Sequence, residues 1–158
     1  AARILRDRGN NFKFRLIGKT DPGSPNSITN EELQSWSDSK VVSVLGFRSD
    51  IADQYMECHL VCLPSYYGEG LPKSLIEAAA CGRPILTSNM PGCRDAIIDG
   101  VTGVLLPCKN PIALADAIES LAENPDVRKK MGIAARKYAE DTFSLESVIA
   151  QHMVIYRS

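Results

Sequence analysis

The sequence predicts an α/β protein built on a doubly wound parallel sheet, with extra helices at its carboxyl end. Short apolar strands alternate with helical segments from residue 12 to residue 106, which is the order of β/α units. Strands one and two end at glycines, Gly18 and Gly46, which is typical of turns at one edge of such a sheet. The rest of the chain reads as helices that begin at Asn-Pro pairs.

The first half of the chain supports this order element by element. Residues 1–9 read as a helix that is already under way, and residues 12–18 alternate like a strand. A surface loop rich in Pro, Gly, Ser and Asn follows at 19–30. Thr29 and Glu32 have the spacing of a capping box, which predicts a short helix behind them. Further strands are predicted at 41–45 and 60–64, with a helix over 51–57 between them.

The second half repeats the pattern and then becomes helical. We expect strands at 84–88 and 102–106, with a short helix over 92–98 between them. Asn110-Pro111 and Asn124-Pro125 each provide an N-cap followed by a proline in the first turn, and apolar stripes follow both pairs. Ser144 is expected to cap a last helix over 145–155.

Size, charge and cysteine content exclude several classes of protein. A chain of 158 residues with 44% hydrophobic and 23% charged residues is typical of one globular domain. The net charge of -1 does not indicate a nucleic-acid partner, and the apolar runs are far shorter than a bilayer requires. The five cysteines show no CxxC spacing, which does not favour a zinc site. Cys58 and Cys62 would lie roughly 13 Å apart on a strand, too far for a disulfide, so we expect reduced thiols in the cytoplasm.

The most informative stretch is the turn from the third strand into the next helix, residues 66–82. Pro72 suits a first helical turn, and Gly82 suits the position just past the helix end. Loops at the carboxyl ends of parallel strands hold ligands in α/β proteins. The start of the helix offers free N–H groups and the positive end of its dipole, which favour an anion.

The helix presents polar side chains on one side. Lys73, Ser74, Glu77 and Cys81 are three or four residues apart and therefore share a face. Glu77 stands among apolar neighbours, and a buried carboxylate is costly unless it accepts hydrogen bonds. Two sugar hydroxyls would supply such donors. The N–H groups at the helix start could bind phosphate, and the Glu77 carboxylate one turn later could accept hydrogen bonds from a diol. This combination fits a nucleotide diphosphate and its ribose.

An E-x7-E motif is formed by Glu69 and Glu77, which are separated by seven residues. The motif lies inside the segment LPSYYGEGLPKSLIEAAACGRPI, and the segment PGCRD follows at 91–95. This wording resembles the retaining glycosyltransferases of family four, the group 1 transferases, which have the GT-B fold. The similarity runs in order through nearly all of the chain. It is closest to enzymes that build bacterial surface glycans from UDP-sugars on a lipid carrier.

The resemblance implies a role for each site residue. Glu69 would contact the donor sugar and Glu77 the ribose hydroxyls, and these two are the candidate catalytic residues. Gly18 would let the diphosphate approach the backbone, with Lys19 as a further phosphate contact. Gly46, Phe47 and Arg48 would border the base, and Tyr66 would shape the pocket. The remaining donor-binding residues surround the diphosphate at the start of the helix: Gly70, Leu71, Pro72, Lys73 and Ser74, of which Pro72 has no N–H to donate.

The resemblance also implies that residues 1–158 are the nucleotide-sugar-binding, C-terminal half of a longer enzyme. The acceptor-binding N-terminal domain would be absent, as would the Arg and Lys with which relatives neutralise the leaving diphosphate. We therefore expect this chain alone to be inactive. The expected partners are a nucleotide-sugar donor and a glycan or lipid-linked acceptor, with no nucleic acid. The full enzyme would be cytoplasmic and associate peripherally with the inner face of the membrane.

The implied reaction is transfer with retention, driven by positioning and by stabilisation of the diphosphate charge. We expect no cofactor and no metal, since the Asp-x-Asp motif of the other transferase fold does not occur in the sequence. Three alternatives stay open. A glycoside hydrolase could use Glu69 and Glu77 as an acid/base pair. An oxidoreductase would need a Gly-x-Gly-x-x-Gly turn, which residues 17–22 do not supply, and a non-catalytic nucleotide-binding module is the third alternative.

Overall fold

The computed structural model describes residues 1–21, 23, 27–68 and 70–157 of the chain. The chain divides into two compact units, Ala1–Ile51 (unit 1) and Ala52–Ser158 (unit 2). Each unit has its own parallel sheet, of two strands in unit 1 and three strands in unit 2. The predicted α/β class with parallel strands is therefore confirmed, whereas the strands are hydrogen-bonded in two sheets and not in one continuous sheet.

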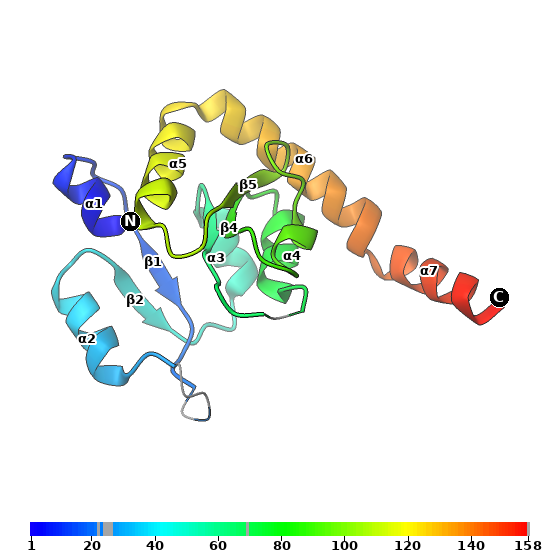
Figure 1. Cartoon of the computed structure of the whole chain (residues 1–158), viewed down its shortest axis with the longest axis horizontal. Helices are drawn as coiled ribbons and strands as arrows, with labels where there is room; N and C mark the ends of the chain where they lie inside the picture. Colours follow the sequence, from blue (N-terminus) through cyan, green and yellow to red (C-terminus); the bar gives the residue numbers. More distant parts are fainter. Residues whose placement is uncertain (22, 24–26, 69, 158) are drawn as a thin grey trace. The chain divides into compact units, whose positions relative to one another are not determined.

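Unit 1 contains α1 (Ala2–Asp7), β1 (Arg15–Ile17), α2 (Asn30–Asp38) and β2 (Ser43–Gly46) (Figure 1). The two strands run parallel, with Leu16 opposite Val44. The predicted capping box is confirmed, because the Thr29 side chain accepts from the Glu32 N–H while the Glu32 carboxylate accepts from the Thr29 N–H.

Unit 2 continues the alternation and ends in three helices. Its sheet has the order β3-β4-β5, and both pairs are parallel. The elements are α3 (Ile51–Glu57, of which Ile51 belongs to unit 1), β3 (Val61–Leu63), α4 (Lys73–Ala80), β4 (Ile85–Ser88), the 3-10 helix η1 (Arg94–Ala96), β5 (Gly103–Leu106), α5 (Pro111–Glu123), α6 (Pro125–Phe143) and α7 (Leu145–Arg157).

The core of unit 2 lies around the central strand. All four residues of β4 are buried, and both α4 and α5 contact this strand. On the inner side of α4, Leu75, Ala78 and Ala79 are almost fully buried. Within the sheet, the Thr87 hydroxyl donates to the Leu63 carbonyl at 2.8 Å, so a polar side chain on β4 is satisfied without water.

Two glycines allow the elements of unit 2 to approach each other closely. A Cβ atom on Gly132 of α6 would lie 2.3 Å from the Gly82 carbonyl oxygen, just after α4. A Cβ atom on Gly103 of β5 would lie equally close, at 2.3 Å, to the Ile85 carbonyl oxygen on β4. Since real Cβ contacts are never this short, both packings require glycine.

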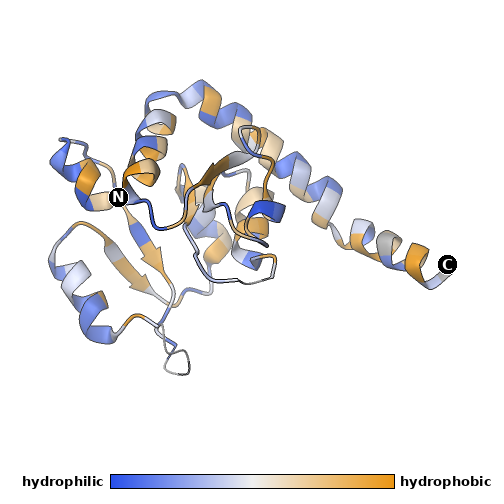
Figure 2. Cartoon of the chain, in the orientation of Figure 1, coloured by the Kyte–Doolittle hydropathy of each residue, from blue (hydrophilic) through white to orange (hydrophobic). Residues whose placement is uncertain are grey.

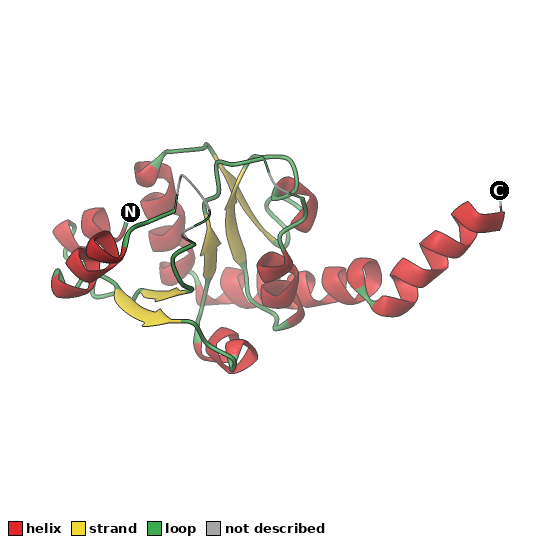
Figure 3. Cartoon of the chain, turned by 90° about the horizontal axis from the view of Figure 1, so that it is seen from below, coloured by secondary structure: helices red, strands yellow, loops and turns green. Residues whose placement is uncertain are grey.

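Hydrophobic residues recur along α7 (Figure 2), and this helix extends beyond the rest of unit 2 (Figure 3). Ser144 caps this helix as predicted, because its hydroxyl accepts from the Ser147 N–H at 3.2 Å. Several large apolar side chains of α7 are exposed: Leu145, Val148, Ile149, Met153, Val154, Ile155 and Tyr156. In the described part of the chain, no helix is both long enough and apolar enough to cross a membrane.

Three local predictions are corrected by the structure. The segment expected to form a short helix over 92–98 forms only the 3-10 turn η1. Pro72 does not enter the first turn of α4, because its extended backbone (ψ 119°) makes it the N-cap. Asn110 caps α5 as expected, whereas the Asn124 amide donates backwards to the Ser120 carbonyl at 2.7 Å, at the end of α5.

Candidate functional site

The two glycines at the carboxyl edge of the unit 1 sheet lie next to each other. Gly18 directly follows β1, and its N–H donates to the carbonyl of Gly46, the last residue of β2, at 2.9 Å. Both have positive φ angles, 142° and 67°, which side chains other than glycine rarely adopt. No atom of the described residues, apart from those of the adjoining residues, lies within 4 Å of where their Cβ atoms would be, so this backbone has open space beside it for a ligand.

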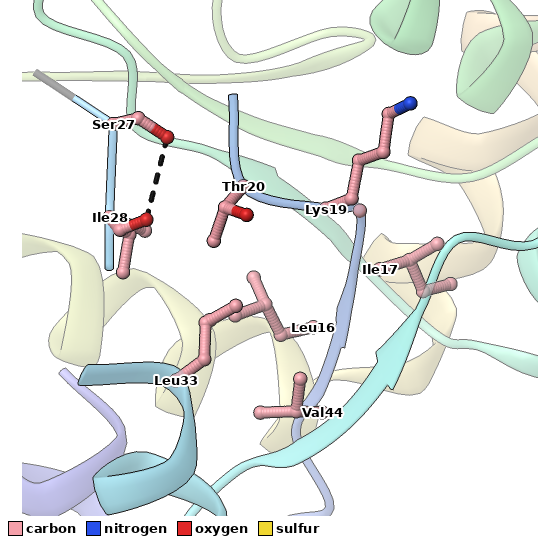
Figure 4. A pocket seen from close by; sticks show the side chains of 9 residues that line it. Leu16, Ile17, Lys19, Thr20, Ser27, Ile28, Leu33 and Val44 are labelled. Atoms are coloured by element: carbon pink, nitrogen blue, oxygen red, sulfur yellow. Dashed lines mark hydrogen bonds between the residues drawn. The ribbon is translucent and has the colours of Figure 1, made fainter. Parts of the chain in front are cut away.

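A pocket of about 290 Å³ opens beside Gly18 within unit 1 (Figure 4). Apolar side chains of β1, β2 and α2, namely Leu16, Val44 and Leu33, face one another at its base. Lys19 also lines the pocket, and its ammonium group points away from the apolar side chains (Figure 4). The sequence predicted Gly18 and Lys19 here but missed three further lining residues from the following loop: Thr20, Ser27 and Ile28.

The two residues after β2 have different environments. Phe47 has 74% of its surface exposed, which is unusual for a large apolar side chain and leaves it accessible to a ligand. The Arg48 side chain is engaged with Asp50, since its Nε donates to Asp50 Oδ1 at 2.7 Å. Arg48 is therefore tied to a carboxylate two residues along the chain.

In unit 2, the start of α4 offers an uncompensated helix N-terminus. Pro72, the N-cap, is buried and forms no side-chain hydrogen bond, and its carbonyl accepts from the N–H of Leu75 at 3.0 Å. The first two helical N–H groups are those of Lys73 and Ser74, and no side chain in the described part of the chain caps them. Gly70 and Leu71, immediately before, are exposed. This geometry favours an anion at the helix start.

Glu77 is less buried than its sequence neighbours suggested. Its side chain is 36% exposed and lies 3.5 Å from the Lys73 ammonium, one helical turn earlier. The prediction that the Glu77 carboxylate is buried is therefore wrong. Helical periodicity turns Glu77 away from the face of α4 that buries Leu75, Ala78 and Ala79. The ion pair itself is weak, because Lys73 is 88% exposed.

Tyr55 of α3 supports the first turn of α4. Its hydroxyl donates to the Ser74 carbonyl at 3.1 Å, and the residue is almost fully buried. Burial, assisted by the negative charge of Glu77, raises the pKa of Tyr55 to about 12. The hydroxyl therefore remains a proton donor at all physiological pH values. Sequence reasoning missed this residue, because the link joins two helices.

A cation and two aromatic rings meet at the carboxyl edge of the unit 2 sheet. Tyr66 and Tyr67 follow β3, with ring centroids 4.3 Å apart, and the Tyr67 hydroxyl donates to that of Tyr66 at 2.7 Å. This hydrogen bond raises the pKa of Tyr67. The ammonium of Lys109, which follows β5, lies 4.5 Å from the centroid of the Tyr66 ring. The sequence predicted Tyr66 but missed Lys109, although it too follows a strand.

The structure thus gathers the predicted residues in two sets, one at the carboxyl edge of each sheet. The set in unit 1 is Gly18, Lys19, Gly46, Phe47 and Arg48, and the set in unit 2 is Tyr66, Gly70, Leu71, Pro72, Lys73, Ser74 and Glu77. Glu69 lies outside the described residues. Among the residues that are described, no group of three or more His, Cys, Asp and Glu side chains could hold a metal ion.

Comparison with known proteins decides the family. The model of the family described as "Glycosyl transferases group 1" matches residues 1–138. The chain belongs to this family. The resemblance seen in the sequence is therefore confirmed, and the match includes both edge sets described above.

Individual relatives agree with this family assignment. The chain is 36% identical over 152 residues to the N,N'-diacetylbacillosaminyl-diphospho-undecaprenol alpha-1,3-N-acetylgalactosaminyltransferase of Campylobacter jejuni, covering 96% of this chain and 37% of the relative. The chain thus spans well under half the length of that protein.

Two solved structures have the same fold as this chain. The glycosyltransferase from Rickettsia africae aligns with a TM-score of 0.85 at 24% identity, over 99% of this chain and 42% of the other. Anabaena HepE, solved in complex with UDP, aligns with a TM-score of 0.77 at 20% identity, over 99% and 52%. At these identities the likeness concerns the fold.

Proposed function

We propose that this chain is the donor-binding part of a retaining glycosyltransferase that takes a sugar from a nucleotide diphosphate, with UDP as the preferred nucleotide. The observation that carries the proposal is the start of α4. Two uncapped N–H groups there stand one helical turn before Glu77, a carboxylate that is still a third exposed and so accessible to a ligand. Membership of the group 1 family supports the same reaction class.

In this proposal the diphosphate lies against the N–H groups of Lys73 and Ser74 at the start of α4. Glu77 accepts hydrogen bonds from the two ribose hydroxyls, replacing its weak contact with Lys73. A charged acceptor that binds a diol contributes about 1.5–3 kcal/mol per bond. Glu69 contacts the donor sugar.

The chain's own groups would act on the reaction by positioning and by electrostatics. As the bond between the sugar and the diphosphate breaks, negative charge grows on the phosphate oxygens. The fixed N–H groups at the start of α4 stabilise that charge without reorganising. The buried Tyr55 hydroxyl holds this turn in place through the Ser74 carbonyl. We propose that the reaction proceeds with retention and without a metal ion, so that EDTA leaves turnover unchanged.

The acceptor is proposed to be a glycan or lipid-linked sugar in bacterial surface polysaccharide synthesis. The Campylobacter jejuni relative supports this, because its name describes transfer to a diphospho-undecaprenol-linked sugar. Acceptor binding would belong to an N-terminal domain of the longer protein. The cytoplasmic enzyme would then work at the inner face of the membrane, where such a lipid carrier is reached.

Substituting the two motif carboxylates in the enzyme that contains this chain tests the proposal. Glu77→Ala should weaken UDP binding, measured by calorimetric titration, by roughly tenfold or more. Glu69→Ala should leave UDP binding nearly unchanged and lower sugar transfer. Glu140→Ala is the matched control, because Glu140 also pairs with a cation one turn earlier, Arg136, on a helix surface.

The outcomes separate the alternatives. Equal loss of UDP binding in both motif variants, with turnover at saturation intact, would contradict the division of labour between the carboxylates. Release of free sugar from a glycoside without any nucleotide would favour the hydrolase. Nucleotide binding without transfer to any acceptor, in the complete enzyme, would favour the non-catalytic module.

A further inference from the structure

A basic groove opens in unit 2 at the edge of the sheet opposite to the candidate donor site. Its cavity measures about 470 Å³. It is lined by residues that precede β3 and β4, namely His59, Arg83 and Pro84, and by the first three turns of α6. The donor-site residues of unit 2, by contrast, follow β3. The groove is therefore a separate feature of the same unit.

The ionisable side chains that line the groove are all basic. Its lining includes five basic side chains and no acidic one; the basic residues are His59, Arg83, Arg128, Lys129 and Arg136. Since the whole chain has a net charge of -1, this concentration of positive charge is local. Arg136 is partly neutralised by Glu140, with Nε 2.8 Å from the carboxylate. Lys129 and His59, both exposed, make no ion pair or side-chain hydrogen bond with the described residues.

Two of the arginines are fixed by backbone contacts that leave N–H groups unused. Arg83 donates from Nη1 to the Cys58 carbonyl at 2.9 Å and from Nε to the Cys81 carbonyl at 3.1 Å. Arg128 donates from Nη1 to two carbonyls at the end of α5, at 2.8 Å and 3.0 Å, and its other N–H groups have no partner among the described residues. A guanidinium has five N–H groups, so each retains donors for a ligand while its position is set.

The frame of the groove is rigid. Gly132 of α6 and Gly82 both line it, and they form the close contact that allows no Cβ atom at Gly132. Pro125, at the start of α6, adds the positive end of a 19-residue helix. Preorganised donors of this kind bind an anion without losing much side-chain entropy.

We propose that this basic groove binds the phosphate group of an anionic ligand. Guanidinium groups match phosphate geometry, and a lone exposed lysine adds a point charge. The volume is suited to a small phosphorylated molecule or to one lipid headgroup. Ile133, on the groove's rim and 63% exposed, offers an apolar contact beside the phosphate. Neither the family's motif nor the proposed donor site uses any of these side chains.

Two probes distinguish the sources of the phosphate. Titration of the chain with inorganic pyrophosphate, followed by NMR through the amide signals of Lys129 and Gly132 in the groove, tests a soluble ligand separately from binding at the start of α4. Sedimentation with phosphatidylglycerol vesicles, compared with phosphatidylcholine vesicles, tests a lipid headgroup. Lys129→Glu should lower the affinity for the probe that binds by roughly tenfold or more. The control is Lys130→Glu, which changes the net charge equally at the next position but does not line the groove.

Pyrophosphate binding that Lys129→Glu abolishes and Lys130→Glu spares supports the proposal with a soluble ligand. The same pattern with phosphatidylglycerol vesicles supports it with a headgroup. The proposal is overturned if neither probe binds, or if both variants weaken binding equally, since the attraction would then be nonspecific. Lys129→Ala and a circular dichroism spectrum of each variant show that a loss of binding is not a loss of fold.

Discussion

Glu77 illustrates how a single side chain can combine an unremarkable contact with a proposed ligand role. Among the described residues its ionic partner is Lys73 at 3.5 Å, and an exposed pair of this kind adds less than about 0.5 kcal/mol. A weak contact is easily exchanged for two hydroxyl donors. The local carboxylate chemistry is therefore compatible with ligand binding in a way that a strong buried ion pair would not be.

Removing the cation of this pair separates the two roles. In Lys73→Ala the backbone N–H of residue 73 remains, so we expect UDP affinity within about threefold of the unsubstituted enzyme, because only a screened charge is lost. Calorimetric titration of Lys73→Ala beside Glu77→Ala measures the difference. If Lys73→Ala loses as much affinity as Glu77→Ala, the carboxylate acts through the ion pair and not as a diol acceptor.

Tyr55 provides a pH-dependent signature. Its pKa is raised to about 12 in the folded chain, above its ordinary value of 10. A raised pKa means that the folded state holds the proton more tightly. The contribution of this group to stability is therefore fully present below pH 10 and is lost as the pH rises towards 12.

Urea unfolding at pH 9 and at pH 11 measures this effect. The unsubstituted chain should lose more stability between the two pH values than Tyr55→Phe, which lacks the titrating hydroxyl. Tyr55→Phe should also be less stable at pH 9 by about 1 kcal/mol, because the Ser74 carbonyl loses its donor. Tyr156→Phe is the control, since that ring is exposed. An equal pH response of Tyr55→Phe and the unsubstituted chain would refute the assignment.

At the scale of elements, the close contact between α6 and the residue after α4 depends on Gly132. Within a helix, glycine is normally worse than alanine by about 1 kcal/mol, so propensity alone predicts that Gly132→Ala stabilises. The Gly82 carbonyl, 2.3 Å from the added Cβ atom, predicts the opposite.

We expect Gly132→Ala to destabilise unit 2 by about 1–3 kcal/mol, because α6 must move away from α4. Ile133→Ala, at the exposed neighbouring position, should change stability by no more than about 0.5 kcal/mol. Thermal and urea unfolding of both variants give the comparison. A more stable Gly132→Ala would mean that the helices separate easily and that propensity dominates.

The elements also show which features could be predicted from sequence. The strand order along the chain, the Thr29–Glu32 capping box and the Ser144 cap depend on neighbouring residues, and all were predicted correctly. Asn124 is the N-cap residue of α6 as predicted, but its side chain does not cap that helix and donates instead to the Ser120 carbonyl of α5, because an asparagine between two helices can bond in either direction. Glu77 was expected to be buried because its sequence neighbours are, whereas helical periodicity turns it to another face.

At the scale of the whole molecule, pairing between distant segments could not be predicted locally. The division of five strands into two hydrogen-bonded sheets depends on contacts that no short sequence window contains. Lys109 over Tyr66, Tyr55 on Ser74 and the basic groove likewise join residues far apart in the chain. Residues that follow parallel strands lie at the carboxyl edge of their sheet. Gly18, Gly46 and Tyr66 could therefore be placed correctly within their own units, because this inference requires only that the parallel strands be recognised.

The central claim is that the N–H groups at the start of α4, in unit 2, bind the diphosphate of a nucleotide. Titration of the 158-residue chain with UDP, followed through backbone amide signals in NMR, tests it most directly, since millimolar affinities remain visible. The account predicts saturable shifts at the amides of Lys73 and Ser74. Shifts confined to other surfaces, or no shift with any nucleotide diphosphate, would contradict the account.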